Sequence, residues 1–199
     1  MRVESAGGQE HKVWLTDSEI EDLRRAANSQ RDDLLIQLGA FVGLRAFEIP
    51  QARPVDVSTS ESGQYRLRVQ SGKDTTGGGG KTRQAYLSDS VERDLQRYQN
   101  EQNIAPRDPY IDLTQSGARA AVDRIAERAA RETGVDDFRK VSTHDLRRRF
   151  AQRLLVDQRM NPRVVMAVSG WDRFAAIEPY LNAPSEEVVD EAFADVQVV

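Results

Sequence analysis

The sequence contains no cysteine, so disulfides, thiolate metal sites and cysteine nucleophiles are all excluded. It also lacks any apolar run long enough to span a bilayer, and its first residues, "MRVESAGGQEHK", lack the apolar block of a signal peptide. The 199 residues are 39% hydrophobic, which is enough to bury a core without covalent staples. These absences predict a cytoplasmic protein that has no membrane partner.

Lysine is scarce, with only Lys12, Lys73, Lys81 and Lys140 in the chain. The net charge of −4 argues at first against a polyanionic partner, because binding to phosphates depends on cationic side chains. The charge is segregated, however. Arg139 to Arg163 holds eight basic residues against two acids, and Gln64 to Tyr86 holds five against one, whereas the last 29 residues hold seven acids against one arginine. The two basic segments could form one anion-facing surface, or they could be ordinary solvated faces.

The first thirteen residues are polar, and we expect them to form a flexible leader. Thr16 and Glu19 have capping-box spacing, which predicts the start of a helix, and "DDLLIQLGAFVGL" predicts a buried second helix that ends near Gly43. "QYRLRVQ" alternates like a strand with one wet face, and "KTRQAYL" is a plausible return strand. The glycine-rich "SGKDTTGGGG" between them predicts a mobile hairpin loop.

The remainder of the chain has helical periodicity. Helices are expected at residues 88–100, 115–131, 143–156, 162–169 and 185–196, with a short piece around residue 180. The last of these long helices has an apolar stripe with acids opposite, which is typical of an amphipathic helix. The overall prediction is an α+β fold, predominantly helical with a small antiparallel sheet, in which residues 14–199 form one domain.

Five short motifs then occur in a suggestive order: "GLRAFEI", "SGK", "HDLR", "GW", and a tyrosine nine residues after the tryptophan. In this order and spacing the chain resembles the tyrosine recombinase, or phage integrase, family from about Trp14 to the C-terminus. The resemblance implies an integrase-like catalytic core with a mobile β-hairpin loop. It also implies that the N-terminal DNA-binding domain usual in the family is missing from this chain.

The chemistry of phosphodiester transesterification gives each motif a purpose. The transition state needs fixed positive charge around the non-bridging oxygens, and no clustered metal ligands are apparent in the sequence. Arg45 and Arg147 could supply that charge, since a guanidinium binds phosphate through two parallel hydrogen bonds. Glu48, one turn after Arg45, could orient it, and His144 and Arg147 share a helical face at i and i+3.

The family resemblance assigns the remaining roles. It implies that His144 assists proton transfer, that Lys73 protonates the leaving 5′ oxygen, that Trp171 donates to a phosphate oxygen, and that Tyr180 is the nucleophile. Lys81, across the same loop, competes with Lys73 for the acid role and is otherwise expected to contact DNA. Arg148 is expected to meet the DNA backbone or solvent. Each residue also has a plainer interpretation, as a surface charge, an exposed loop lysine, a core tryptophan or a half-buried helix tyrosine.

The leading hypothesis is therefore a site-specific DNA recombinase that cuts and rejoins DNA through a 3′-phosphotyrosyl link, with no cofactor and no metal. Its partners would be double-stranded DNA and other copies of itself, as a tetramer on synapsed DNA and a monomer or dimer when free. It would act in the cytoplasm at the nucleoid. A non-cleaving DNA-binding regulator on the same scaffold is the main alternative. An acidic interaction module and a type IB topoisomerase are less favoured.

Overall fold

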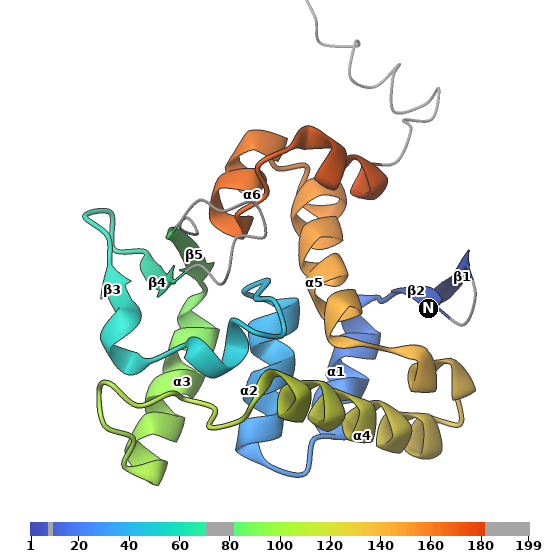
Figure 1. Cartoon of the computed structure of the whole chain (residues 1–199), viewed down its shortest axis with the longest axis horizontal. Coiled ribbons are helices and arrows are strands. Elements are labelled where there is room, and N and C mark those ends of the chain that lie inside the picture. The colour runs from blue at the N-terminus through green and yellow to red at the C-terminus, as the bar shows by residue number, and fades with distance from the viewer. Residues whose placement is uncertain (8–9, 71–81, 182–199) are drawn as a thin grey trace, which may run out of the picture.

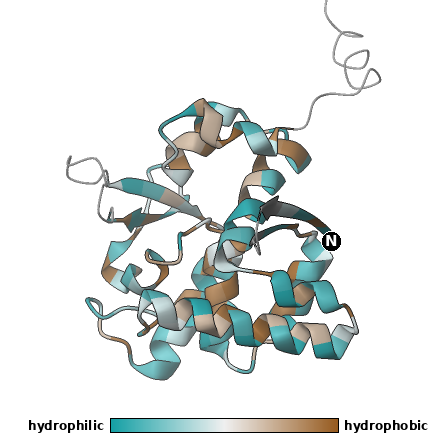
Figure 2. Cartoon of the chain, turned by 45° about the vertical axis from the view of Figure 1, so that its right-hand side comes forward, coloured by the Kyte–Doolittle hydropathy of each residue, from teal (hydrophilic) through white to brown (hydrophobic). Residues whose placement is uncertain are grey.

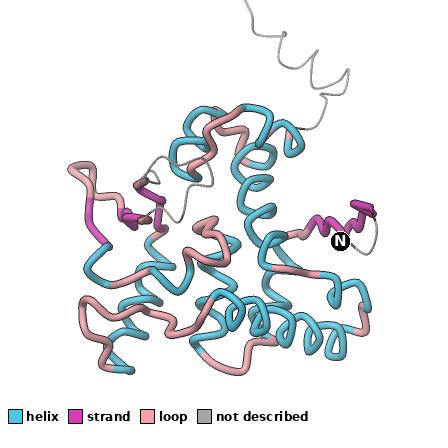
Figure 3. Tube along the Cα trace, viewed as in Figure 1, coloured by secondary structure: helices cyan, strands magenta, loops and turns pink. Residues whose placement is uncertain are grey.

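The computed structural model describes residues 1–7, 10–70 and 82–181. In this part of the chain a mostly helical body carries two small antiparallel sheets, which lie on opposite sides of it (Figure 3). The α+β prediction is confirmed. The hairpin loop from residue 71 to 81, with Lys73 and Lys81, and the predicted helix over residues 185–196 both lie outside the described residues.

Six α-helices form the body (Figure 1), and each long helix predicted within the described residues is present. They are α1 Asp17–Arg25, α2 Gln30–Ala40, α3 Asp89–Gln102, α4 Gln115–Thr133, α5 Thr143–Gln152 and α6 Pro162–Ser169. The predicted capping box starts α1. The Thr16 side chain accepts from the backbone N–H of Glu19, and the Glu19 side chain accepts from the backbone N–H of Thr16. Helix α5 is shorter than predicted because its last residues form a π-helical turn, Arg153–Asp157.

The larger sheet has the order β3-β4-β5, with β3 Val57–Thr59, β4 Tyr65–Val69 and β5 Arg83–Leu87. Strands β4 and β5 are the predicted hairpin. Strand β3 was not predicted, since three mostly exposed residues give too short a pattern to recognise. In the β4–β5 pairing Val69 lies opposite Arg83. Strand β5 also contacts α6, and Arg83 at its start reaches Val168 near the end of that helix.

The N-terminal segment differs from the expectation of a flexible leader. Strands β1 Arg2–Gly7 and β2 Glu10–Trp14 pair antiparallel in a second sheet. Met1 and Val3 pack against the core, and the terminal amino group forms an ion pair with Glu19. Polar composition did not reveal this hairpin, because the few apolar residues that meet the core, such as the paired Val3 and Val13, are separated by polar ones.

Two apolar clusters hold the described chain together. The main one gathers side chains from α1, α2, α4, α5 and the larger sheet, and the second joins the end of α5 to α6 and to the segment around Tyr180. The helices in view carry both polar and apolar positions (Figure 2), as expected of amphipathic helices. Among the described residues, no helix has the length and hydropathy to cross a bilayer.

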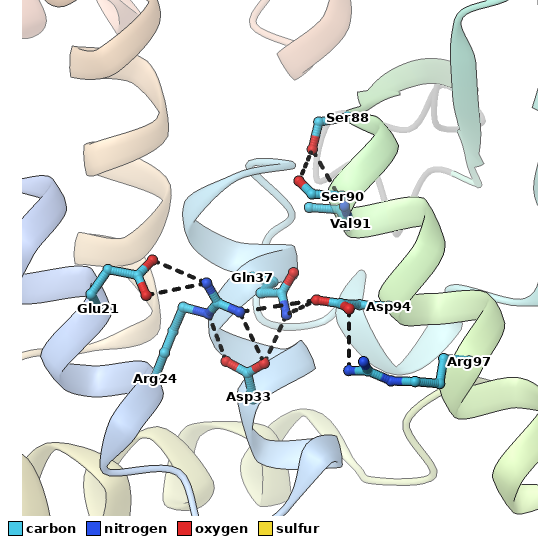
Figure 4. Close-up of polar contacts among 9 residues, drawn as sticks. All are labelled: Glu21, Arg24, Asp33, Gln37, Ser88, Ser90, Val91, Asp94 and Arg97. Carbon is cyan, nitrogen blue, oxygen red and sulfur yellow. Dashed lines mark hydrogen bonds and ion pairs between the residues drawn. The ribbon is translucent and has the colours of Figure 1, made fainter.

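A polar network fixes α2 between its neighbours α1 and α3 (Figure 4). Arg24 of α1 donates to Asp33 of α2 at 2.7 Å and to Glu21 at 3.0 Å. Gln37 donates to Asp33 at 2.8 Å and to Asp94 of α3 at 3.0 Å. The network anchors the helix whose C-terminal end leads directly into the "GLRAFEI" segment.

Candidate active site

The last turn of α6 collects three arginines that are distant in the sequence. Three consecutive carbonyl oxygens each accept from a different guanidinium: that of Val168 from Arg83 Nε at 3.2 Å, that of Ser169 from Arg147 Nη2 at 2.8 Å, and that of Gly170 from Arg45 Nη2 at 3.1 Å. Free carbonyl groups at a helix C-terminus attract cations, which explains why this turn gathers them. Three separate parts of the chain therefore meet at residues 168–170.

Glu48 links two of these arginines. Its carboxylate accepts from Arg45 Nη1 at 2.9 Å and from the Arg45 backbone at 2.7 Å, and it receives both terminal nitrogens of Arg83 at 2.6 and 2.7 Å. Burial, with 2% of the residue exposed, would raise the pKa of Glu48, but the hydrogen bonds from Arg83 and Arg45 hold it at about 2. Glu48 is therefore ionised, and the predicted support for Arg45 is present.

Arg147 is the most enclosed of the three arginines, at 3% exposure. Besides Ser169 it donates to the carbonyl of Gly43, and its guanidinium lies 4.4 Å from the ring centroid of Trp171. Gly43 has φ +73°, and a Cβ there would clash with Phe150 at 2.4 Å, so glycine is required. Burial and then the charge of Arg45 lower the pKa of Arg147 to about 9, which leaves the group protonated at neutral pH.

His144 lies on the first turn of α5, one helical turn before Arg147, and its side chain is exposed. Partial burial of the imidazole and then the charge of Arg148 lower its pKa from the usual 6.5, with Arg147 and Arg45 acting in the same direction. The imidazole is therefore mostly neutral at pH 7. His144 therefore lies close enough to Arg45 and Arg147, the two arginines predicted to bind the phosphate, to interact with their charges.

Tyr180 is enclosed by two tryptophans. Its ring centroid lies 5.7 Å from that of Trp171 and 6.1 Å from that of Trp14, the latter edge to face, and 8% of the residue is exposed. Its phenol group also lies within electrostatic reach of Arg147. The predicted short helical piece is present as a 3₁₀ turn, Glu178–Tyr180. Arg45, Glu48, His144, Arg147, Trp171 and Tyr180 thus converge on one site.

Comparison of the sequence with models of known protein families shows which family the chain belongs to. The model described as "Phage integrase family" matches residues 13–187, which is most of the chain. The chain belongs to the phage integrase family. The suspected resemblance is confirmed, and the motif residues sit within the matched range.

Known relatives agree with the family. A tyrosine recombinase of Pseudothermotoga lettingae is 28% identical over 178 residues, which are 89% of this chain and 58% of that protein. XerA recombinase superposes with a TM-score of 0.68 at 18% identity over 96% of this chain and 65% of its own. XerH bound to palindromic difH substrate gives 0.66 at 21% identity over 96% and 55%. The structural matches establish the fold, and the chain spans roughly three fifths of these relatives.

Arg148 does not join the site. It is 6% exposed, forms an ion pair with the buried Asp145 and lies 5.5 Å from the ring of Trp14. Asp145 also accepts from the backbone of Val13 at 2.9 Å, so this pair fastens α5 to β2. The expectation that Arg148 meets DNA or solvent is corrected, because its position on the helix turns it toward the N-terminal strand.

Two residues of this integrase site were missed from the sequence. Arg83 opens β5 and shares a face with the buried Ala85 and Leu87, so strand alternation could have marked it as an inward-facing arginine. Trp14 was treated only as a boundary, and no local pattern connects it with Tyr180. Among the described residues, no group of three or more histidines and carboxylates is gathered as a metal site would require.

Proposed function

We propose that this protein is a site-specific DNA recombinase whose nucleophile is Tyr180. The observation that carries the proposal is that Arg45 and Arg147 meet at the end of α6, with His144 within electrostatic reach of both and Tyr180 within electrostatic reach of Arg147. Such a cluster of protonated guanidinium groups suits a phosphate anion, because each guanidinium can bind it through two parallel hydrogen bonds. The carboxylate that would cancel its charge, Glu48, is already bound by two arginines.

In the proposed reaction the phenolic oxygen of Tyr180 attacks the scissile phosphorus. A new bond forms between that oxygen and phosphorus, the bond to the 5′ oxygen breaks, and the leaving oxygen takes a proton from Lys73, or from Lys81. The product is a 3′-phosphotyrosyl link and a free 5′ hydroxyl, which can later attack a partner strand and reverse the step. The neutral imidazole of His144 can accept the phenolic proton.

Arg45 and Arg147 would neutralise the charge that develops on the non-bridging oxygens. Preorganised donors of this kind account for a large share of transition-state stabilisation. Arg45 is accessible, with 35% of its side chain exposed, but Arg147 is covered by the ring of Trp171. We infer that the segment from Trp171 to Tyr180 shifts when DNA binds, so that the phosphate reaches Arg147 and the phenol moves into line behind it.

Double-stranded DNA is the proposed partner, and synapsis of two duplexes would require several copies of the chain. Such work would place the protein in the cytoplasm at the nucleoid. A non-cleaving DNA-binding regulator remains the second candidate, and the burial of Tyr180 and Arg147 is the observation in its favour. The two proposals differ in whether a covalent link to DNA ever forms.

The test uses nicked duplexes that tile the DNA flanking the gene, and especially any repeated sequence there. Nicked DNA traps the link because the short fragment that carries the free 5′ hydroxyl diffuses away after cleavage and cannot reverse the step. The wild-type protein should give an adduct that survives denaturing electrophoresis, in the presence of a chelator, and Tyr180→Phe should give none. Tyr98→Phe is the matched control, because Tyr98 lies on α3, and it should leave the adduct unchanged.

Protein that shifts these duplexes in a native gel but never forms an adduct would replace the recombinase proposal with the regulator. An adduct that persists in Tyr180→Phe would assign the chemistry to a different residue.

A further inference from the structure

Arg83 is a buried cation, and each of its three guanidinium nitrogens donates a hydrogen bond within the protein. Only 8% of its side chain is exposed, and its three nitrogens donate to Glu48 and to the carbonyl of Val168. An arginine with every nitrogen committed to protein acceptors is poorly placed to bind a phosphate itself. Its contribution has to pass through the groups that it holds.

The most important of those groups is Glu48. Arg83 donates to both carboxylate oxygens of Glu48, and Arg45 donates to the same two oxygens, to Oε1 from its guanidinium and to Oε2 from its backbone. Arg83 therefore fixes the orientation of the carboxylate that binds Arg45. A bidentate guanidinium–carboxylate pair restricts orientation as well as distance. Without Arg83, the remaining bonds to Glu48 would come from the backbone and side chain of Arg45 itself, so the carboxylate would no longer be fixed from outside that segment.

Close packing shows that Arg83 is built into the site. Gly170 has φ +70°, and a Cβ there would lie 2.7 Å from Cδ of Arg83, so the turn before Trp171 closes directly over the arginine side chain. The same arginine begins β5, immediately after the hairpin loop. Arg83 therefore connects the hairpin, the Arg45 segment and the end of α6.

We propose that Arg83 is a positioning residue for strand cleavage, which acts through Glu48 to hold Arg45 at the scissile phosphate and ties the base of the hairpin to the α6 turn. This inference rests on the proposed recombinase function and adds to it a residue that does not touch DNA.

The chain supplies its own matched control. Asp56, 3% exposed, is bound by Arg53, three residues before it, at 2.8 Å and by Arg68 of β4 at 2.8 Å. Glu48 is bound in the same pattern by Arg45, three residues before it, and by an arginine of β5. Arg68→Gln therefore removes one strand arginine from a buried carboxylate, as Arg83→Gln does, but this carboxylate is bound to Arg53 and not to Arg45.

The experiment measures the single-turnover rate of adduct formation on a nicked duplex as a function of DNA concentration. Arg83→Gln should lower the maximal rate by about 30-fold, which is less than the roughly 10²-fold or more that outright loss of a charge-stabilising donor costs. The DNA concentration at half-maximal rate should change by less than about 3-fold, because Arg83 does not contact DNA. Arg68→Gln should leave the maximal rate within about 2-fold of wild type.

Two further variants test the route through Glu48. Arg83→Lys keeps the charge but not the bidentate geometry, so it should fold as wild type does and retain an intermediate maximal rate. Glu48→Gln should slow cleavage on its own, and adding Arg83→Gln to it should cause little further loss, because both changes break one chain of contacts.

Equal maximal rates for Arg83→Gln and Arg68→Gln, or full additivity with Glu48→Gln, would overturn the inference even while wild-type protein forms its Tyr180 adduct. Absence of the wild-type adduct would instead contradict the recombinase proposal. In that case a crystal structure of Arg83→Gln decides the inference alone: Arg45 should leave the carbonyl of Gly170, and an unmoved Arg45 would refute it.

Discussion

The molecule builds the same polar motif twice, and the two copies differ in what surrounds them. The Glu48 cluster consists of Arg45, Glu48 and Arg83, and the Asp56 cluster consists of Arg53, Asp56 and Arg68. Each has a buried carboxylate, an arginine three residues before it and an arginine from the larger sheet. In the Asp56 cluster both arginines reach solvent, with 30% and 49% of their side chains exposed.

The difference lies in the charge balance. Around Glu48 the chain adds Arg147 and the exposed His144, and the three guanidinium groups share one carboxylate and the carbonyl groups of a helix end. Nothing comparable is added to the described Asp56 cluster, whose arginines can be neutralised by water and ions. Two arginines bound to one carboxylate can serve the fold alone. A third arginine beside them, here Arg147, leaves the site with excess positive charge that can attract an anion.

The largest expected effect concerns that additional arginine. Arg147→Gln should slow adduct formation by about 10³-fold, the loss typical of removing a transition-state donor. Arg53→Gln, which removes an arginine from the comparison cluster, should change it by less than about 2-fold. Single-turnover rates on a nicked duplex provide the measurement, and equal losses in the two variants would remove the distinction between the clusters.

The second expected effect concerns stability. Glu48→Gln should lower the free energy of unfolding by about 3 kcal/mol, because it leaves the buried Arg83 without its counter-ion. Asp56→Asn should cost only about 1 kcal/mol, since both of its arginines can turn to water. Urea denaturation at pH 7 gives both values. A larger loss at Asp56 would show that exposure of the arginines is not what separates the two clusters.

The pH dependence of stability should carry the same signature. The folded protein holds the pKa of Glu48 at about 2, below the ordinary 4.5, so ionised Glu48 stabilises the fold fully above pH 4.5. That contribution, roughly 3 kcal/mol, is lost as the pH falls from 4.5 towards 2. Urea midpoints at a series of pH values should therefore fall less steeply in Glu48→Gln than in wild type. Parallel curves would contradict the assignment.

The smallest expected effect is a shift in the titration of His144. Burial and then the positive charges of Arg148, Arg147 and Arg45 lower the pKa of His144, so Arg45→Gln should raise it. Arg68→Gln should not move it. Proton NMR of the two histidines, assigned with His144→Asn, gives the values, and a shift caused by Arg68→Gln would argue that the field is not local.

Sequence patterns were sufficient for the long helices of the described chain, for the β4–β5 hairpin and for most of the site. Periodicity and capping residues placed the helices of the described chain, and the spacing of Arg45, His144, Arg147, Trp171 and Tyr180 predicted residues that the fold brings together. Their roles in catalysis stay predictions until cleavage is measured. Local patterns succeed here because each motif sits on a single helix or turn.

Contacts between distant segments were not predictable in this way. Nothing near Arg148 in the sequence indicates that β2 will cover it, and nothing near Trp14 indicates that it will pack on Tyr180. Arg83 was obscured for another reason: it was counted as one charge of a basic segment, although its alternation with Ala85 and Leu87 places it inward. Charge counting ignores direction, and direction decides whether an arginine meets solvent or a carboxylate.

The most direct measurement is a crystal structure of Tyr180→Phe protein bound to a duplex that it recognises. We expect the scissile phosphate at the α6 turn, with oxygens about 2.8 Å from nitrogens of Arg45 and Arg147. We also expect Trp171 to be displaced from its position over Arg147. A phosphate held instead by Arg53 and Arg68, or DNA bound with Arg147 still covered, would contradict this prediction.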